Sequence, residues 1–254
     1  MVRSFVRFGA PRPPARALPA TAPGERIYAI GDVHGRFDLL HQLMKLIEDD
    51  ARSRGECATR LVFLGDLIDR GPCSRQLLEL VRRAHQELDG VTVLLGNHED
   101  LLLESAYGSA SAQRAWLQNG GDATLRSFGI DPCELAKASS DEMAETLFKV
   151  IGDRAIAWLD SLPLCFQSGD YFFCHAGIRP KISLEKQQRM DLLWIRTKFL
   201  ESRRYHGAVI VHGHSEVGEI AFHHNHINVD TAAYRTGVLT AVGLQSTEQW
   251  SIQT

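Results

Sequence analysis

Three short apolar runs in the first half of the chain each stop at a glycine that polar residues follow. The runs RIYAI, LVFL and VTVLL occupy residues 26–30, 61–64 and 91–95. Apolar runs of this length predict buried strands. Segments with apolar residues at helical spacing follow each run, at 37–50, at 74–88 and from Leu101 onward. Strands that alternate with helices predict βαβ units with parallel pairing.

The second half of the chain has a different pattern. Residues 111–161 are largely helical with Gly, Asp and Ser breaks, and we interpret them as a helical insertion that covers one rim of the sheet. Residues 162–178 predict two strands joined by a tight turn at 168–170, and residues 191–202 predict a helix. From Ala208 onward, short apolar strands alternate with polar turns. This β-rich half predicts a second sheet packed on the first.

The composition is that of an ordinary globular protein. Hydrophobic residues make up 44% and charged residues 23% of the 254 residues, which suits one large α/β domain or two small ones. The net charge of −3 provides no basic field and argues against a nucleic-acid partner. None of the five cysteines shows CxxC spacing, which favours reduced thiols and a cytoplasmic protein.

The first 24 residues carry four arginines and no acidic residue. They contain no apolar stretch long enough for a signal peptide or a membrane span. We interpret residues 1–24 as a disordered Arg/Pro/Ala-rich arm, with a targeting or anion-binding tail as the alternative. Residues 25–254 are predicted to form one domain, because no linker divides them.

Polar side chains follow the predicted strands where the strands end. They are Asp32, His34, Asp66, Asp69, Arg70, Asn97, His98, His175, His212 and His214. In open α/β sheets, sites form at the carboxyl ends of the strands, so we expect these side chains to converge. Imidazoles, carboxylates and an amide oxygen are ligands for Mn, Fe or Zn ions. Asp66 ends the middle strand and is the natural carboxylate to bridge two ions.

Five short motifs, taken in order, carry a family resemblance. They are GDVHG at 31–35, GDLIDRG at 65–71, GNHE at 96–99, HAG at 175–177 and HGH at 212–214. Together they resemble the phosphoprotein phosphatase family of metallophosphoesterases, and the Asp-Arg of the second motif is similar to bacterial serine/threonine protein phosphatases. The resemblance implies a calcineurin-like α/β fold, a central β-sandwich of two mixed sheets flanked by helices.

The resemblance also implies two metal positions that share one carboxylate. The first would be held by Asp32, His34 and Asp66, and the second by Asp66, Asn97, His175 and His214. The last motif favours His214 as the ligand, although His212 stays open as the alternative. The cofactor would be two divalent metal ions, with Mn expected first and Fe or Zn also compatible.

The same resemblance implies the catalytic roles. His98 would protonate the leaving alkoxide, and Asp69 would orient His98 and fix its tautomer. Arg70 would bind the phosphate, with Arg196 as a second phosphate arginine. A hydroxide bridging the two metals would attack phosphorus in line. Glu99 would support the ligands or interact with a helix N-terminus.

The first functional hypothesis is a metal-dependent phosphomonoesterase that removes phosphate from phosphoserine or phosphothreonine in proteins. The alternative is a diadenosine tetraphosphate (dinucleoside polyphosphate) hydrolase of the same fold. The pair Asp69 and Arg70 favours the first, because the dinucleotide hydrolases tend to lack it. A third hypothesis is an inactive metal-binding scaffold, against which the complete motifs argue. The expected partner is a phosphoprotein substrate, with no nucleic acid, no membrane and no assigned oligomeric state.

Other conspicuous residues receive plainer interpretations. Trp116 is interpreted as a packing residue of the core, and Trp194 as a wall of the site. The HHNH sequence at 223–226 is interpreted as a surface turn. Ser215 and Glu216 stand where many bacterial relatives have Thr-Pro, so we expect the rim of the site to differ in geometry and charge.

Overall fold

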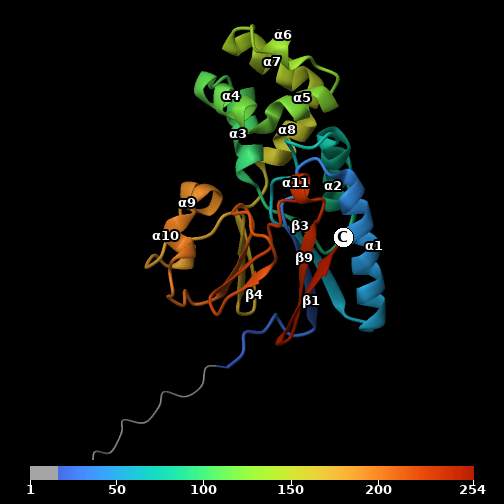
Figure 1. Cartoon of the computed structure of the whole chain (residues 1–254), viewed down its shortest axis with the longest axis vertical. Helices are drawn as coiled ribbons and strands as arrows, with labels where there is room; N and C mark the ends of the chain where they lie inside the picture. The colour runs from blue at the N-terminus through green and yellow to red at the C-terminus, as the bar shows by residue number, and fades with distance from the viewer. Residues whose placement is uncertain (1–16) are drawn as a thin grey trace, which may run out of the picture.

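The computed structural model of the chain describes residues 17–254. Figure 1 shows two sheets side by side, with helices α1 and α2 along one side and a group of helices at one end. The first sheet contains β1 (Glu25–Ile30), β2 (Ala58–Phe63), β3 (Val91–Val93), β9 (Thr240–Gln245) and β10 (Glu248–Gln253). The second contains β4 (Cys165–Ser168), β5 (Tyr171–Cys174), β6 (Val209–His212), β7 (Ala221–Phe222) and β8 (His226–Asn228).

The helices fall into three groups. Beside the first sheet lie α1 (Phe37–Ser53) and α2 (Ser74–Glu87). The end group comprises α3 (Asn97–Ala106), α4 (Ala110–Trp116), the π-helical turn η1 (Leu117–Gly121), α5 (Asp122–Ser127), α6 (Pro132–Leu135), α7 (Ser140–Ile151) and α8 (Asp153–Asp160). The remaining elements are the 3₁₀ turn η2 (Leu184–Lys186), α9 (Arg189–Trp194), α10 (Thr197–Leu200) and α11 (Ala233–Thr236). Within the described residues, no helix is both long enough and apolar enough to cross a membrane.

The first sheet confirms the predicted parallel strands. Its order is β10-β9-β1-β2-β3, and β2 pairs in parallel with both β1 and β3. The three strands therefore end at the same edge, and the polar motifs that follow them start there. Parallel pairing requires a crossover between strands, which α1 and α2 supply in the first two βαβ units.

The last two strands differ from the prediction. We expected the β-rich second half to build the second sheet alone, but β9 pairs antiparallel with β1, and β10 pairs with β9. Because β9 is buried along nearly its whole length, it suits a position inside the sheet. Its pairing also satisfies the backbone groups along that edge of β1.

The core lies between the two sheets and beneath the helices. One cluster joins inner-face residues of both sheets, such as Ile27, Val62, Tyr171 and Phe173. A larger cluster packs α1, α2 and the end group against the other face of the first sheet. A third packs α9 and α10 on the outer face of the second sheet. Two mixed sheets flanked by helices confirm the predicted fold class.

The helix after β3 begins earlier than predicted. It starts at Asn97, directly after Gly96, and not at Leu101. The Glu99 carboxylate accepts the backbone N–H of Gly96, as in a capping box, so the polar motif itself forms the first helical turn. Asn97 and His98 therefore project from a helix, which fixes their directions more firmly than a loop would.

The prediction of a single helix over residues 191–202 is wrong. Helix α9 ends at Trp194 and α10 begins at Thr197. Between them, Ile195 has an extended backbone with φ −65° and ψ 141°. Ile195 is buried in the cluster outside the second sheet, so the chain leaves the helical path while keeping this side chain in the core.

Residues 19–22, which lie within the segment predicted to be a disordered arm, contact both sheets, whereas Ala17 and Leu18 are exposed. The N–H of Thr21 donates to the carbonyl of Ser246 at 3.0 Å, and the N–H of Asp170 donates to the carbonyl of Ala20 at 2.8 Å. These bonds tie the segment to a hairpin turn of each sheet. The prediction for residues 1–16 lies outside the described residues.

The interpretation of residues 223–226 as a surface turn holds only in part. His226 is buried at the start of β8, and its ring stacks on that of His223 with a centroid distance of 4.3 Å. His224 is exposed and bonds to the carbonyl of Arg203 at 2.9 Å. The His226 ring also lies 5.2 Å from that of Phe199 and 5.4 Å from that of His212, so it is packed among rings and not at the surface.

Candidate active site

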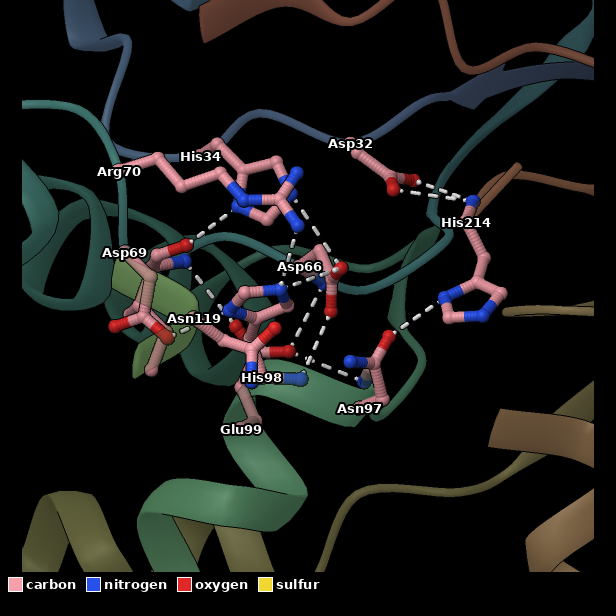
Figure 2. Close-up of polar contacts among 12 residues, drawn as sticks. Asp32, His34, Asp66, Asp69, Arg70, Asn97, His98, Glu99, Asn119 and His214 are labelled. Atoms are coloured by element: carbon pink, nitrogen blue, oxygen red, sulfur yellow. Dashed lines mark hydrogen bonds and ion pairs between the residues drawn. The ribbon is translucent and has the colours of Figure 1, made fainter. Parts of the chain in front are cut away.

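The chain brings residues from five strand ends to one place. Asp32 and His34 follow β1, Asp66 follows β2, Asn97 follows β3, His175 follows β5 and His214 follows β6. All six predicted metal ligands are buried, the most exposed being His214 at 5%. Figure 2 shows Asp66 near the centre, with Asn97 and His214 on one side and His34 on the other.

Asp66 belongs to two groups of side chains that could each hold a metal ion. The first comprises His34, Asp66 and His98, and the second comprises Asp66, His175 and His214; within each group the ligand atoms lie within 4.8 Å of one another. One oxygen of Asp66 lies 3.5 Å from His34 Nε2, and the other lies 3.4 Å from His175 Nε2. A single carboxylate thus faces both groups, as a bridging ligand would.

The histidines present nitrogen lone pairs to the centre. His34 Nδ1 lies 2.7 Å from the carbonyl of Ile68, and His175 Nδ1 lies 2.9 Å from the carbonyl of Leu64. A carbonyl can only accept, so each Nδ1 carries the proton. The Nε2 of the neutral His34 ring therefore keeps its lone pair, whereas His175 Nε2 faces the amide oxygen of Asn97 at 2.7 Å. Within the part of the chain that is described, His34 Nε2 is buried with no hydrogen-bond partner. This donor set fits a metal cation.

Burial keeps these imidazoles neutral, which is the form that binds metals. It lowers the pKa of His34 well below the ordinary value and also lowers that of His175. For His214, burial and the neighbouring His175 lower the pKa to about 2. Burial acts to raise the pKa of Asp66, but its interactions with the histidines around it outweigh burial and hold the pKa below the ordinary value.

The geometry separates His214 from His212. His214 Nδ1 and His175 Nε2 each lie 2.7 Å from the amide oxygen of Asn97, and the backbone N–H of His214 donates to Asp32. The ring of His212 instead packs between Phe199 and His226, outside both ligand groups. The candidate centre therefore includes His214.

Glu99 joins the loop after β2 to the start of α3. One carboxylate oxygen accepts the N–H groups of Asp66 and Gly96, at 2.9 and 3.1 Å. The other accepts those of Leu67 and Ile68, at 2.8 and 3.2 Å. Glu99 is fully buried, and burial together with Asp66 raises its pKa to about 7. Glu99 thus holds the backbone of the loop that carries Asp66 against the start of α3.

We expect Glu99→Gln to destabilise this loop. The glutamine amide turns one acceptor oxygen into a donor, so two buried N–H groups lose their partner. The free energy of unfolding should fall by about 2–4 kcal/mol. Denaturant unfolding of the chelator-treated protein measures this change, with Glu104→Gln on the exposed side of α3 as the control. Equal stability of the two variants would contradict the supporting role of Glu99.

His98 is held by Asp69 and faces Arg70. His98 Nδ1 lies 2.6 Å from Asp69 Oδ2, and Nε2 lies 3.1 Å from Arg70 Nη2. The carboxylate accepts the Nδ1 proton, so Nε2 is the atom that can exchange a proton with a ligand. Burial acts to lower the pKa of His98, but Asp66 and Asp69 outweigh it and hold the pKa above the ordinary value.

Trp116, which the sequence indicated only as a core packing residue, and Thr124, which it did not indicate, also contact Asp69. The indole N–H of Trp116 donates to both carboxylate oxygens, at 3.0 and 3.1 Å, and the Thr124 hydroxyl donates to Oδ1 at 2.6 Å. Burial raises the pKa of Asp69, whereas the bonds from His98, Thr124 and Trp116 act to lower it. In the sequence, the adjacent glycines at 120–121, between two helical patterns, were the available signal that the chain bends at this point.

Arg70 lies at the rim, where Glu216 also points. Arg70 Nη1 is 3.7 Å from Glu216 Oε1, and the guanidinium lies over the Tyr234 ring, 4.7 Å from its centroid. Glu216 also accepts from the Tyr234 hydroxyl at 2.9 Å and pairs with Arg235. The change from proline that the sequence indicated therefore places a carboxylate next to the predicted phosphate arginine.

The two remaining candidates lie near the second ligand group. Arg196 is exposed in the break between α9 and α10, and its charge contributes to lowering the pKa of His175 and His214. The Trp194 ring packs edge-on against His214 with a centroid distance of 6.1 Å. Trp194 thus walls the candidate centre as expected.

Comparisons with known proteins agree with this arrangement. Residues 25–242 match the family described as Calcineurin-like phosphoesterase. A symmetrical bis(5'-nucleosyl)-tetraphosphatase of Aromatoleum aromaticum is 32% identical over 154 residues, which cover 61% of this chain and 45% of that protein. Serine/threonine-protein phosphatase 1 of Salmonella typhimurium is 29% identical over 180 residues, which cover 70% of this chain and 71% of that protein. The present chain thus spans about half the length of the matched tetraphosphatases.

Solved structures show the same fold. A putative diadenosine tetraphosphatase superposes with a TM-score of 0.61 and 19% identity, covering 92% of this chain and 98% of that chain. The cold-active protein-tyrosine phosphatase of a Shewanella species superposes with a TM-score of 0.55 and 18% identity, covering 92% and 83%. These likenesses confirm the predicted sandwich and do not separate the candidate substrates.

Proposed function

From the premise that this chain belongs to the calcineurin-like phosphoesterase family, we propose that it hydrolyses phosphate esters at the site around Asp66, and that alkyl phosphomonoesters such as phosphoserine and phosphothreonine in proteins are its substrates. The observation that carries the proposal is the pairing of two ligand groups on the Asp66 carboxylate, one of which includes an imidazole, His98, that a second carboxylate holds. The two ligand groups would supply a metal-dependent centre, and His98 would supply a proton donor.

The metal-holding residues are proposed from their donor atoms. Asp32, His34 and Asp66 would hold one divalent ion, and Asp66, Asn97, His175 and His214 the other. Mn suits this mixture of nitrogen and oxygen donors, as do Fe and Zn. When bound, the two ions supply an activated water as the nucleophile and neutralise charge on the phosphoryl oxygens.

The other residues act on the substrate. The Arg70 guanidinium offers a fork of donors that fits two phosphoryl oxygens. Arg196, which is exposed near His175 and His214, is the candidate for a second such contact. His98 would donate a proton from Nε2 to the leaving oxygen once Arg70, whose guanidinium donates to Nε2 in this structure, contacts the phosphate instead, while Asp69 keeps Nδ1 protonated and stabilises the charged ring.

The His98 proton donor is the geometric argument for the substrate class. An alkoxide is a strong base and leaves phosphorus readily only when it is protonated, so hydrolysis of a serine or threonine phosphate gains much from a general acid. A nucleotide phosphate is a weaker base and can leave as an anion. The buried pair of Asp69 and His98 therefore suits an alkyl phosphomonoester better than a polyphosphate anhydride.

The names of the relatives favour the second candidate, a dinucleoside polyphosphate hydrolase. Several of the similar proteins are named tetraphosphatases. By sequence similarity alone, the dinucleoside polyphosphate hydrolase therefore ranks above the phosphoprotein phosphatase. The match to the protein phosphatase, however, extends over more of both chains. Both substrates therefore enter the test.

The test is phosphate release by purified protein, stripped with chelator and reloaded with Mn²⁺, from a phosphothreonine peptide and from diadenosine tetraphosphate in parallel. We expect a higher kcat/KM on the peptide. A higher value on the dinucleotide would replace the first candidate with the second. Loss of both activities in the presence of bound metal would overturn the enzymatic proposal and support a binding role.

The rim carboxylate gives a further prediction. Glu216 competes with substrate phosphate for Arg70, so Glu216→Gln should tighten competitive inhibition by inorganic phosphate by about two- to fivefold, the range for a partly exposed ion pair. Steady-state inhibition kinetics measure this. Glu219→Gln, an exposed change a few residues further along the same loop, is the control. Unchanged or weaker inhibition in Glu216→Gln would show that the two groups do not compete.

A further inference from the structure

The segment from the end of α4 to α5 wraps around Asp69 and Arg70. The backbone N–H of Arg70 donates to the carbonyl of Gly120 at 3.1 Å. Gly120 lies within the π-helical turn η1 and has φ 106°, outside the helical region. Here the distortion brings one backbone carbonyl to the strained loop after β2.

The segment approaches Arg70 and Trp116 too closely for a side chain at Gly120 or Gly121. A Cβ at Gly120 would lie 2.8 Å from Arg70 Cγ and 2.9 Å from its backbone nitrogen. A Cβ at Gly121 would lie 2.5 Å from the Trp116 ring. The two glycines therefore allow this segment to pack directly against Trp116 and the loop after β2.

The loop itself needs outside support. Asp69 and Arg70 both have positive φ, 72° and 64°, a conformation that costs about 1–2 kcal/mol for each residue with a side chain. The N–H of Asp69 donates to the hydroxyls of Ser74 and Thr124, at 3.1 and 3.0 Å. The backbone is thus held in its strained form by α2 and α5.

The Asp69 side chain is fixed by three donors. Oδ2 accepts from His98 Nδ1 at 2.6 Å and from the Trp116 indole at 3.0 Å. Oδ1 accepts from the Thr124 hydroxyl at 2.6 Å and from the same indole at 3.1 Å. The indole N–H lies across both oxygens, so it fixes the rotation of the carboxylate about its own axis. That rotation decides where the His98 ring points.

A buried tryptophan is ordinarily a packing residue, and the end group provides one for comparison. The Trp158 indole N–H donates to His85 Nδ1 at 2.9 Å, between α8 and α2. That bond ends on a partly exposed histidine outside the candidate centre. The Trp116 bond ends on the carboxylate that holds His98, and Trp116 is itself fully buried.

We propose that Trp116 and Thr124 are positioning residues that hold the Asp69 carboxylate so that His98 Nε2 points at the leaving oxygen. This rests on the proposed function, in which His98 is the proton donor. The helical region at 110–160 then contributes to catalysis itself, in addition to covering the rim. The consequence depends on the substrate, because only substrates with a poor leaving group need the donated proton.

The test compares two substrates across matched variants. Trp116→Phe removes the indole N–H but keeps an aromatic ring, and Thr124→Val removes the hydroxyl. Each should lower kcat on a phosphothreonine peptide by about tenfold and change kcat on 2,4-dinitrophenyl phosphate by less than about twofold. Thr124→Ser keeps the hydroxyl and should restore the peptide activity. Trp158→Phe makes the same change at a buried tryptophan outside the site and should leave both rates unchanged.

A second readout does not depend on turnover. In the Zn²⁺-loaded protein, the His98 Nδ1 proton bound to Asp69 should give a low-field ¹H resonance, identified by its absence in His98→Asn. Trp116→Phe should shift or broaden it, and Trp158→Phe should not. If the unchanged protein hydrolyses no substrate yet the resonance responds to Trp116, the positioning inference holds and the proposed function fails.

Two outcomes would overturn the inference. Equal losses on both substrates in Trp116→Phe would mean that the indole supports the fold or the metals and not the proton donor. If the protein is active but neither its rates nor its Nδ1 resonance changes in Trp116→Phe and Thr124→Val, then His98 and Asp69 need no outside support.

Discussion

Replacing His98 with asparagine should lower kcat on a phosphothreonine peptide by about 10²–10⁴-fold, the range for loss of a general acid. The structural reason is the short bond from His98 Nδ1 to Asp69, which leaves Nε2 as the proton-exchanging atom beside Arg70. Asparagine has no proton to give at that position. The loss should appear in kcat and to the same extent in kcat/KM, because the proton moves only in the transition state.

The same variant tests whether His98 is a ligand instead. His98 lies in one of the two ligand groups, with its Nε2 3.8 Å from Asp66. Elemental analysis of His98→Asn should return the metal content of the unchanged protein, whereas loss of one ion would reassign His98 as a ligand. His41→Asn, an exposed change on α1, is the control for handling.

Non-additivity provides an internal check. If Asp69 acts only through His98, then Asp69→Asn should add little further loss to His98→Asn. Multiplicative losses in the double variant would give Asp69 a separate role. The bonds from Trp116 and Thr124 would then need another explanation as well.

The sequence predicted the parts of the fold that rest on local pattern. Apolar runs that end in glycine identified β1, β2 and β3, and helical spacing identified α1 and α2, because one buried face imposes its periodicity on the chain. The partner of β9 could not be predicted in this way. An apolar strand fits either sheet, and only the unpaired edge of β1 in the assembled molecule selects it.

The start of α3 shows a different limit. The polar motif at 96–99 looks like a loop in a pattern of hydrophobicity, yet it forms a helical turn because Glu99 caps it. The cap works only together with the loop after β2, whose N–H groups the same carboxylate accepts. A long-range contact thus decides a local structure.

The candidate site likewise has residues that the sequence predicted and residues that only the structure identifies. The candidate metal ligands could be expected from their motifs, and the fold brings them together. Trp116 and Thr124 carry no comparable signal, since an indole and a hydroxyl occur in many cores, and only the orientation of their donors toward Asp69 distinguishes them. Glu216 was noticed as a departure, but its pairing with Arg70 required the three-dimensional arrangement.

Asp66→Asn should have the largest effect of all on the metal centre. Asp66 contributes to both ligand groups, so loss of its charge weakens both positions, and catalysis should fall by about 10³-fold or more as metal-derived charge stabilisation is lost. Asparagine is the informative replacement for two reasons. It tolerates the left-handed backbone at this position, φ 50°, and its amide oxygen can still accept the N–H of His98, now 3.0 Å from Asp66 Oδ1.

The variant should therefore fold but bind little metal at either position. Elemental analysis after dialysis against Mn²⁺ measures the content, and circular dichroism checks the fold. Asp191→Asn, which alters a buried carboxylate paired with Arg179 outside the site, should keep full metal content. Loss of only one ion in Asp66→Asn would mean that Asp66 serves a single metal. In that case Asp32, held by the N–H of His214, would be the carboxylate between the two groups.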